Sequence, residues 1–219
     1  MGRRAPRDRR NAPGRPVERE PNIVTLVVEC VRDPRLMRQV GAGAITGGNL
    51  LAQIAVAFAA VMFLAGALEA LVGTTAQALG PLRAGLVSVL GSAGGLLALT
   101  LALYALAGIV GSGLPFGRLL TGLAFLNVIG GAVKVLIAAA MGALMVTGLT
   151  GALPAFAVGL GGVLQLASFV VMTVLYVNFL MGVFDLGCFL SVILGVAAAF
   201  LAGVITGLWA GLIAAVVVG

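Results

Sequence analysis

Residues Gly117–Gly148 form the stretch that decides the fold, GRLLTGLAFLNVIGGAVKVLIAAAMGALMVTG. The stretch is almost wholly apolar, and it is long enough to cross a bilayer, which takes about 20 residues in a helix. Within it, Asn127, Gly131 and Lys134 are spaced i, i+4, i+7, so they share one helix face. A polar and small face on an apolar helix points at protein rather than lipid. The stretch therefore predicts one span of a helix bundle, with Lys134 directed into that bundle.

The charged residues of the chain are segregated. Only 9% of the 219 residues are charged and 61% are hydrophobic, whereas a soluble domain carries about 25% charged residues. Ten of the thirteen Lys and Arg precede Gly41, and the charged residues that follow are Glu69, Arg83, Arg118, Lys134 and Asp185. This pattern predicts a basic leader followed by a membrane domain that covers residues 41–219.

The leader and the segment after it differ in their capacity to fold. Residues 1–21 are rich in Arg and Pro with almost no large apolar residues, so they cannot bury a core and are expected to be disordered. We expect them to lie beside anionic lipid headgroups on the cytoplasmic side, with no nucleic acid as partner. Residues 22–40 carry an apolar face at helical spacing, formed by Ile23, Leu26, Val27 and Cys30. This predicts an interfacial amphipathic helix that ends at Pro34.

Long apolar stretches separated by Gly and Pro predict five spans and an all-α polytopic bundle. The expected spans are Gly43–Leu71, Leu82–Val110, Arg118–Val146, Ala155–Met181 and Cys188–Val217. Four or six spans remain alternatives. The basic leader places the N-terminus in the cytoplasm, and an odd number of spans then places the C-terminus outside. The composition, rich in Arg, Ala, Gly and Val, suits a bacterial inner-membrane protein.

The residue inventory excludes most enzyme chemistry. The chain has no histidine, so it lacks the base of a Ser-His pair, the HExxH zinc motif and a histidine ligand for haem. Its two cysteines, Cys30 and Cys188, are far apart and form no CxxC pair, so they do not build a structural zinc site. We expect no catalytic residue, no metal and no cofactor, and we expect a non-enzymatic protein.

The candidate site residues are therefore polar side chains within the predicted spans. Lys134 is the sharpest of them, because ionisable groups in the bilayer are costly and mark a pathway or a partner. We expect a structural ion pair between Lys134 and Glu69, or a lysine that snorkels to the outer surface. A transport path through Lys134 is the alternative. The remaining candidates are Asn127, which shares the face of Lys134, and the amide residues Asn49, Gln53 and Gln165. We expect these three amides to form hydrogen bonds between helices or to line a solute path.

Glycine is patterned as well as abundant, with 33 residues in the chain. Gly203, Gly207 and Gly211 follow one another at intervals of four in the last predicted span. Small residues at this spacing let two helix backbones approach closely. The repeat predicts a tight helix contact, either within one chain or between two chains.

The order of these features resembles the Yip1 domain family. The resemblance rests on the lead-in VVECVRDPRLMRQVGAG, on the turn and basic start of the third span in GSGLPFGRLLTGLAFLNV, and on the link NFLMGVFDLGCFL. It implies a five-span architecture and a non-enzymatic membrane role, that of a scaffold or accessory protein. Such a protein would associate by helix packing with itself or with a membrane-protein partner. A small permease or transporter subunit that uses Lys134 is the competing interpretation.

Overall fold

The computed structural model describes residues 22–42, 48–72, 80–110, 115–146 and 154–218. Within these ranges every regular element is an α-helix, which confirms the all-α prediction. The helices are α1 (Ile23–Arg32), α2 (Leu36–Gly41), α3 (Gly48–Val72), α4 (Gly80–Val110), α5 (Phe116–Val146), α6 (Pro154–Phe184) and α7 (Cys188–Val218). The predicted disordered leader, residues 1–21, lies outside the described residues.

In the described part of the chain, five helices are long and apolar enough to cross a membrane. These candidate spans are Asn49–Leu71, Gly80–Ile109, Phe116–Ala143, Leu160–Phe184 and Cys188–Leu208. Their number agrees with the five-span prediction rather than with four or six. Their length and composition define an integral membrane protein, since soluble domains do not carry five apolar segments of this length.

The short helix α1 begins and ends where local chemistry dictates. At its start, the Oδ1 of Asn22 accepts a hydrogen bond from the backbone N–H of Val24 at 3.2 Å, which is the usual role of an N-cap side chain. At its end, the N–H of Asp33 donates to the carbonyl oxygen of Glu29 at 2.7 Å. Pro34 follows and has no N–H with which to continue the helix. The chain then turns into α2, a separate helix that the sequence analysis did not resolve.

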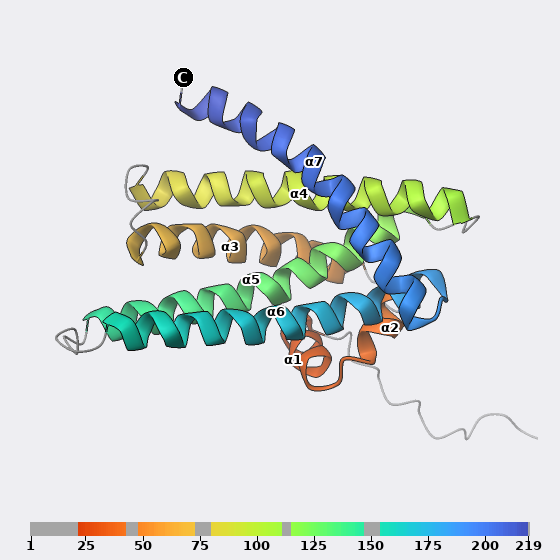
Figure 1. Ribbon diagram of the computed structural model, residues 1–219, viewed down its shortest axis with the longest axis horizontal. Helices are drawn as coiled ribbons and strands as arrows, with labels where there is room; N and C mark the ends of the chain where they lie inside the picture. The colour runs from red at the N-terminus through yellow and green to blue at the C-terminus, as the bar shows by residue number, and fades with distance from the viewer. Residues whose placement is uncertain (1–21, 43–47, 73–79, 111–114, 147–153, 219) are drawn as a thin grey trace, which may run out of the picture.

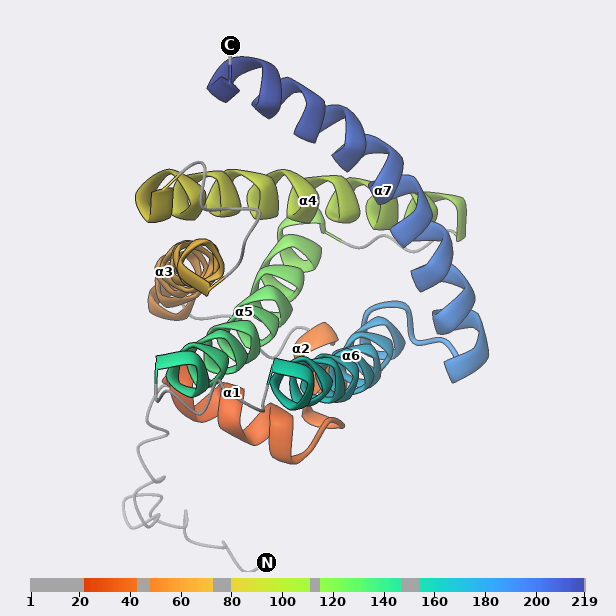
Figure 2. The same cartoon turned by 60° about the vertical axis from the view of Figure 1, so that its left-hand side comes forward.

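The spans pack side by side around α5. Figure 1 shows α3, α4, α5 and α6 running lengthwise beside one another, with α7 inclined across α4. In the same view α1 is seen nearly end-on, so its axis lies across the spans. Figure 2 shows α1 lengthwise beneath α5 and α6. Helix α3 contacts α4 and α5, α7 contacts mainly α4, and α2 lies against α6.

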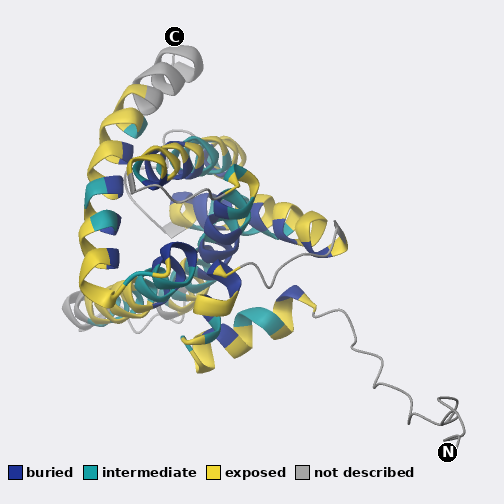
Figure 3. Ribbon diagram, turned by 90° about the vertical axis from the view of Figure 1, so that its right-hand side faces the viewer, coloured by how far each residue is buried: buried dark blue, intermediate teal, exposed yellow. Residues whose placement is uncertain are grey.

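The core is apolar and centres on the first half of α5. Side chains from all the helices join it, and those with the largest fully buried volumes include Phe125, Phe179, Met37, Leu103 and Leu119. Only 22% to 33% of each candidate span is buried inside the bundle. In Figure 3 the coloured part of α7 has buried and intermediate residues on the side turned to the bundle, and exposed residues on its other sides. Most of the outer surface of the spans is therefore available to lipid.

The backbones of α2 and α6 approach closely at two glycines. A Cβ added at Gly182 would collide with the carbonyl oxygen of Arg38 and would lie 2.7 Å from its carbonyl carbon. On the other side of the contact, a Cβ at Gly41 would collide with the carbonyl oxygen of Phe179. Because only glycine lacks a Cβ, the two glycines permit α2 to lie against the end of α6.

Candidate functional site

Asn127 and Gly131 lie on a face of α5 that contacts other helices, as predicted. A Cβ added at Gly131 would lie 2.5 Å from Cγ1 of Val61 on α3. A Cβ on the neighbouring Gly130 would lie 3.0 Å from Cε of Met172 on α6. Gly131 is buried and Asn127 is half-buried. This face of α5 therefore lies between α3 and α6.

Lys134 is exposed, so the prediction that it points into the bundle is wrong. It lies three and four residues beyond Gly131 and Gly130, so it shares their face but stands one turn further along α5. Val61 and Met62 of α3 lie against Gly131, whereas the Lys134 side chain is exposed.

The structure does not bring Lys134 and Glu69 together. Glu69 is also exposed, near the end of α3. Among the described residues no ion pair joins the two side chains, and each lacks a hydrogen-bonding partner. A charged group on the outside of a span must find its partner in the headgroup region or in another protein.

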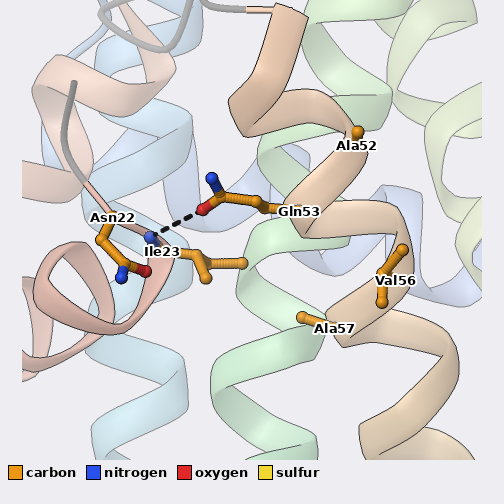
Figure 4. A pocket seen from close by; sticks show the side chains of 6 residues that line it. All are labelled: Asn22, Ile23, Ala52, Gln53, Val56 and Ala57. Atoms are coloured by element: carbon orange, nitrogen blue, oxygen red, sulfur yellow. Dashed lines mark hydrogen bonds between the residues drawn. The ribbon is translucent and has the colours of Figure 1, made fainter.

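Gln53, a predicted site residue, forms a hydrogen bond between two helices. Its Oε1 accepts from the backbone N–H of Ile23 at 3.2 Å, which ties the start of α1 to α3 (Figure 4). Asn49, one turn earlier on α3, is exposed. The N–H of Ile23 is one of the free donors at a helix start, and the glutamine satisfies it.

An open groove adjoins this hydrogen bond. It encloses about 490 Å³ and is lined by Asn22, Ile23, Ala52, Gln53, Val56 and Ala57. Figure 4 shows the amide side chain of Asn22 at the start of α1, the amide side chain of Gln53 on α3, and the small apolar side chains along α3. The groove is amphiphilic, with polar groups at one end and an apolar wall beyond them.

The other polar residues of the spans mostly bond to their own helix. The Nδ2 of Asn127 donates to the carbonyl oxygen of Leu123 at 2.9 Å, and Asn178 donates to that of Val174 at 2.9 Å. The side chain of Asn127 is thus bonded to its own helix. Gln165 is exposed on α6 and has no hydrogen bond to any described residue. Backbone bonding four residues back satisfies a polar side chain without help from a second helix.

Two glycines of the α7 repeat, Gly203 and Gly207, do not mark a contact within the chain. A Cβ at Gly203 or Gly207 would meet nothing within 4 Å, and both residues are exposed. The surroundings of the third member of the repeat, Gly211, lie outside the described side chains. A tight contact inside the chain is thus excluded at Gly203 and Gly207, while a contact between chains stays a prediction.

Three buried polar atoms lack a partner in the described structure: Nε of Arg118, the hydroxyl of Tyr176 and Oγ of Ser191. Tyr176 and Ser191 belong to the α6–α7 contact, because a Cβ at Gly195 would lie 3.0 Å from Cε1 of Tyr176 and Ser191 is one turn away. The sequence analysis did not select these residues. Their isolated hydroxyl groups have no spacing that distinguishes them from ordinary residues of a span.

The cysteines differ in their surroundings. Cys30 is buried on the side of α1 that faces the bundle, and Cys188 is exposed at the start of α7. Burial raises the pKa of the Cys30 thiol from 9.0 to about 11, and the neighbouring carboxylates of Glu29 and Asp33 add to the rise. Among the described residues no group of three or more His, Cys, Asp or Glu is placed to hold a metal ion.

These features define a polytopic helical membrane protein in which Glu69, Lys134 and Gln165 lie on the outside of the bundle. Comparison with protein-family models, with curated proteins and with solved structures gives no match to this chain.

Proposed function

We propose that the protein is a non-enzymatic integral membrane scaffold or accessory protein, which associates by helix packing with itself or with another membrane protein. The observation that carries the proposal is the outward placement of Lys134 and Gln165 within the candidate spans. In contrast, the buried polar residues of the described core are Thr100 and Ser191. A bundle with an apolar core and polar groups outside suits contact with a partner better than passage of a solute.

Lys134 and Gln165 lie at similar depths on neighbouring helices. Met172 on α6 approaches Gly130 on α5, and Met141 on α5 approaches Gly161 on α6. The two helices therefore run in opposite directions, and a step of eleven residues forward along α5 matches a step of eleven residues back along α6. Lys134 is then level with residue 168, and Gln165 is three residues beyond, a separation of about 4.5 Å along the axis. A partner helix that crosses α5 and α6 at this depth can bond to both side chains.

The energetic reason for a partner is the cost of these groups in lipid. On scales measured by membrane insertion, a lysine at the centre of a span costs about 2.5–3.5 kcal/mol of insertion free energy. Snorkelling lowers that cost, and a carboxylate or a carbonyl on another helix lowers it further. The open glycine face of α7, at Gly203 and Gly207, gives a second place where a helix can approach closely.

The proposed orientation has the N-terminus in the cytoplasm and the C-terminus outside a bacterial inner membrane. It rests on the ten basic residues before Gly41 and on the odd number of spans. Reporter fusions at the two ends test it. Signals from opposite compartments are expected, and signals from the same compartment would contradict the five-span topology.

Assembly in mild detergent tests the scaffold function. The full chain is expressed in two differently tagged copies, and co-purified copies and co-purified membrane proteins are measured. The variant Lys134→Leu with Gln165→Leu should reduce recovery of the partner at least several-fold. The matched control is Leu136→Ala with Leu166→Ala, two lipid-exposed side chains on the same helices, at 69% and 64% exposure.

Two results would count against the proposal. One is recovery from the wild type that does not exceed that from an unrelated membrane protein. The other is equal recovery from the polar variant and its control. If assembly persists in the polar variant while solute uptake by the cells is lost, the permease interpretation replaces the scaffold.

A further inference from the structure

We propose that α1 is inserted into the lipid leaflet at its own end of the bundle, with Val24, Val28 and Val31 in contact with acyl chains. The inference concerns the α1 face that the protein leaves uncovered. It goes beyond the proposed function, because it holds whether or not α5 and α6 bind a partner.

Helix α1 has two apolar stripes, and only one of them touches the bundle. Ile23 and Cys30 are buried, at 9% and 0% exposure, and Leu26 and Val27 pack against the same core. The second stripe runs along Val24, Val28 and Val31, which are spaced i, i+4, i+7 and are 65%, 61% and 46% exposed. Valine at this spacing on a second face is unexpected for a helix that has only water beside it.

The polar residues of α1 occupy the remaining arc. Thr25, Glu29 and Arg32 are all exposed and share a third stripe. At about 100° per residue, the valines lie to one side of the bundle-facing stripe and the polar residues lie opposite the bundle. The two apolar stripes form one continuous arc of about 200°, which is wider than contact with the bundle requires.

The position of α1 fits the membrane interface. Its axis lies across the spans, since it is nearly end-on in Figure 1 and lengthwise in Figure 2. The hydrogen bond from Ile23 to Gln53 ties the start of α1 to α3. Gln53 is the fifth residue after Gly48, where α3 begins, so the start of α1 lies about 7–8 Å along α3 from its first residue. A helix that lies in the plane of the membrane at this depth meets the boundary between headgroups and acyl chains.

Lipid is the occupant that the surroundings favour. The start of α1 adjoins the apolar wall of α3, where Val56 is 71% exposed on a lipid-facing span, so the uncovered surface is continuous with that of the bundle. Arg32, the last residue of α1, and Arg35, just before α2, are both exposed. Their charge suits the anionic headgroups above the acyl chains.

Spin labels on the full-length protein test the insertion. Single cysteines replace Val24, Val28 and Val31 in turn, and Thr25, Glu29 and Arg32 serve as matched controls on the same helix. Cys188 is changed to Ser, and the buried Cys30 is left in place. The labelled proteins are reconstituted into vesicles of phosphatidylglycerol and phosphatidylethanolamine, and collision rates with oxygen and with a water-soluble nickel complex are measured.

The ratio of oxygen to nickel accessibility should be several-fold higher at the three valine positions than at the three polar positions. Equal ratios would show that the valines face water, and they would overturn the proposal. Low accessibility to both reagents at the valine positions would show a protein cover, such as a second copy, and would also overturn it. All six positions are exposed, and three sites report each stripe, so one perturbing label leaves two others to decide the result.

Discussion

The substitution Gly182→Ala should destabilise the protein, although alanine is the better helix former. The added methyl group would meet the backbone of Arg38, with its carbonyl carbon at 2.7 Å and its Cα at 2.8 Å. Backbone atoms cannot rotate away as a side-chain end can, so α2 must shift. Overpacking of this kind costs about 1–3 kcal/mol, while the change from glycine to alanine returns about 1 kcal/mol of helix propensity.

The matched control is Gly203→Ala, because it gains the same propensity and its methyl group meets nothing within 4 Å. The difference between the two variants isolates the α2–α6 contact at about 1–3 kcal/mol. For a chain of this size each kcal/mol moves the melting temperature by about 2–4 °C, so the two variants should differ by about 2–12 °C.

The assay follows the reaction of Cys30 with a fluorogenic maleimide during heating in detergent, on a Cys188→Ser background. Cys30 is fully buried and becomes reactive when α1 leaves the bundle. Gly182→Ala should melt below the wild type, and Gly203→Ala should melt at or slightly above it. Equal melting temperatures for the two variants would refute the close approach of α2 to α6.

Three further predictions follow from side-chain surroundings. Lys134→Met and Glu69→Gln should show a coupling energy below about 0.5 kcal/mol in a double-mutant cycle of thermal stability. The reason is that no ion pair joins the two side chains in the described structure. A larger coupling energy would mean that they pair. Gln53→Leu should cost about 0.5–1.5 kcal/mol and speed hydrogen exchange in α1, since it removes the acceptor at the start of that helix, whereas Gln165→Leu should leave the stability of the chain unchanged. The pKa of Cys30 is raised to about 11, so its protonated form stabilises the fold; that stability is complete below pH 9 and is lost as the pH rises from about 9 to about 11. Alkylation rates of Cys30 against pH check the last prediction, and a midpoint near 9 in the folded protein would contradict it.

The spans could be predicted from sequence because apolar length alone decides whether a segment crosses a bilayer. The third span was expected over Arg118–Val146 and is found as Phe116–Val146, and the last was expected over Cys188–Val217 and is found as Cys188–Val218. The stop of α1 before Pro34 was also predictable, since it depends on the missing N–H of one residue.

The direction of individual side chains around each span was harder to predict. Asn127, Gly131 and Lys134 share one face, yet Asn127 is half-buried, Gly131 is buried and Lys134 is exposed. Where a neighbouring helix turns away is a property of the tertiary packing, and hydropathy carries no signal for it. The same limit explains α7, where a regular glycine repeat faces open space at Gly203.

The tight glycine contact at Gly182 could not be predicted from the sequence, because its two sides are far apart in the chain. Its partner, Gly41, lies in a six-residue helix before the first span, 141 positions earlier in the chain. Neither glycine belongs to a repeat that marks a packing face. The contact arises only when α2 folds back onto the end of α6, which local sequence does not encode.

Photo-cross-linking in native membranes tests the central claim most directly. A photoreactive amino acid is placed at Lys134, and in a separate protein at Leu136, which is 69% exposed on the same helix and points away from the face of Lys134. The account predicts a discrete protein adduct from position 134, either a second copy or another membrane protein, and lipid adducts alone from position 136. Lipid adducts alone from both positions would contradict the claim that the outward-facing polar groups of the bundle contact a partner.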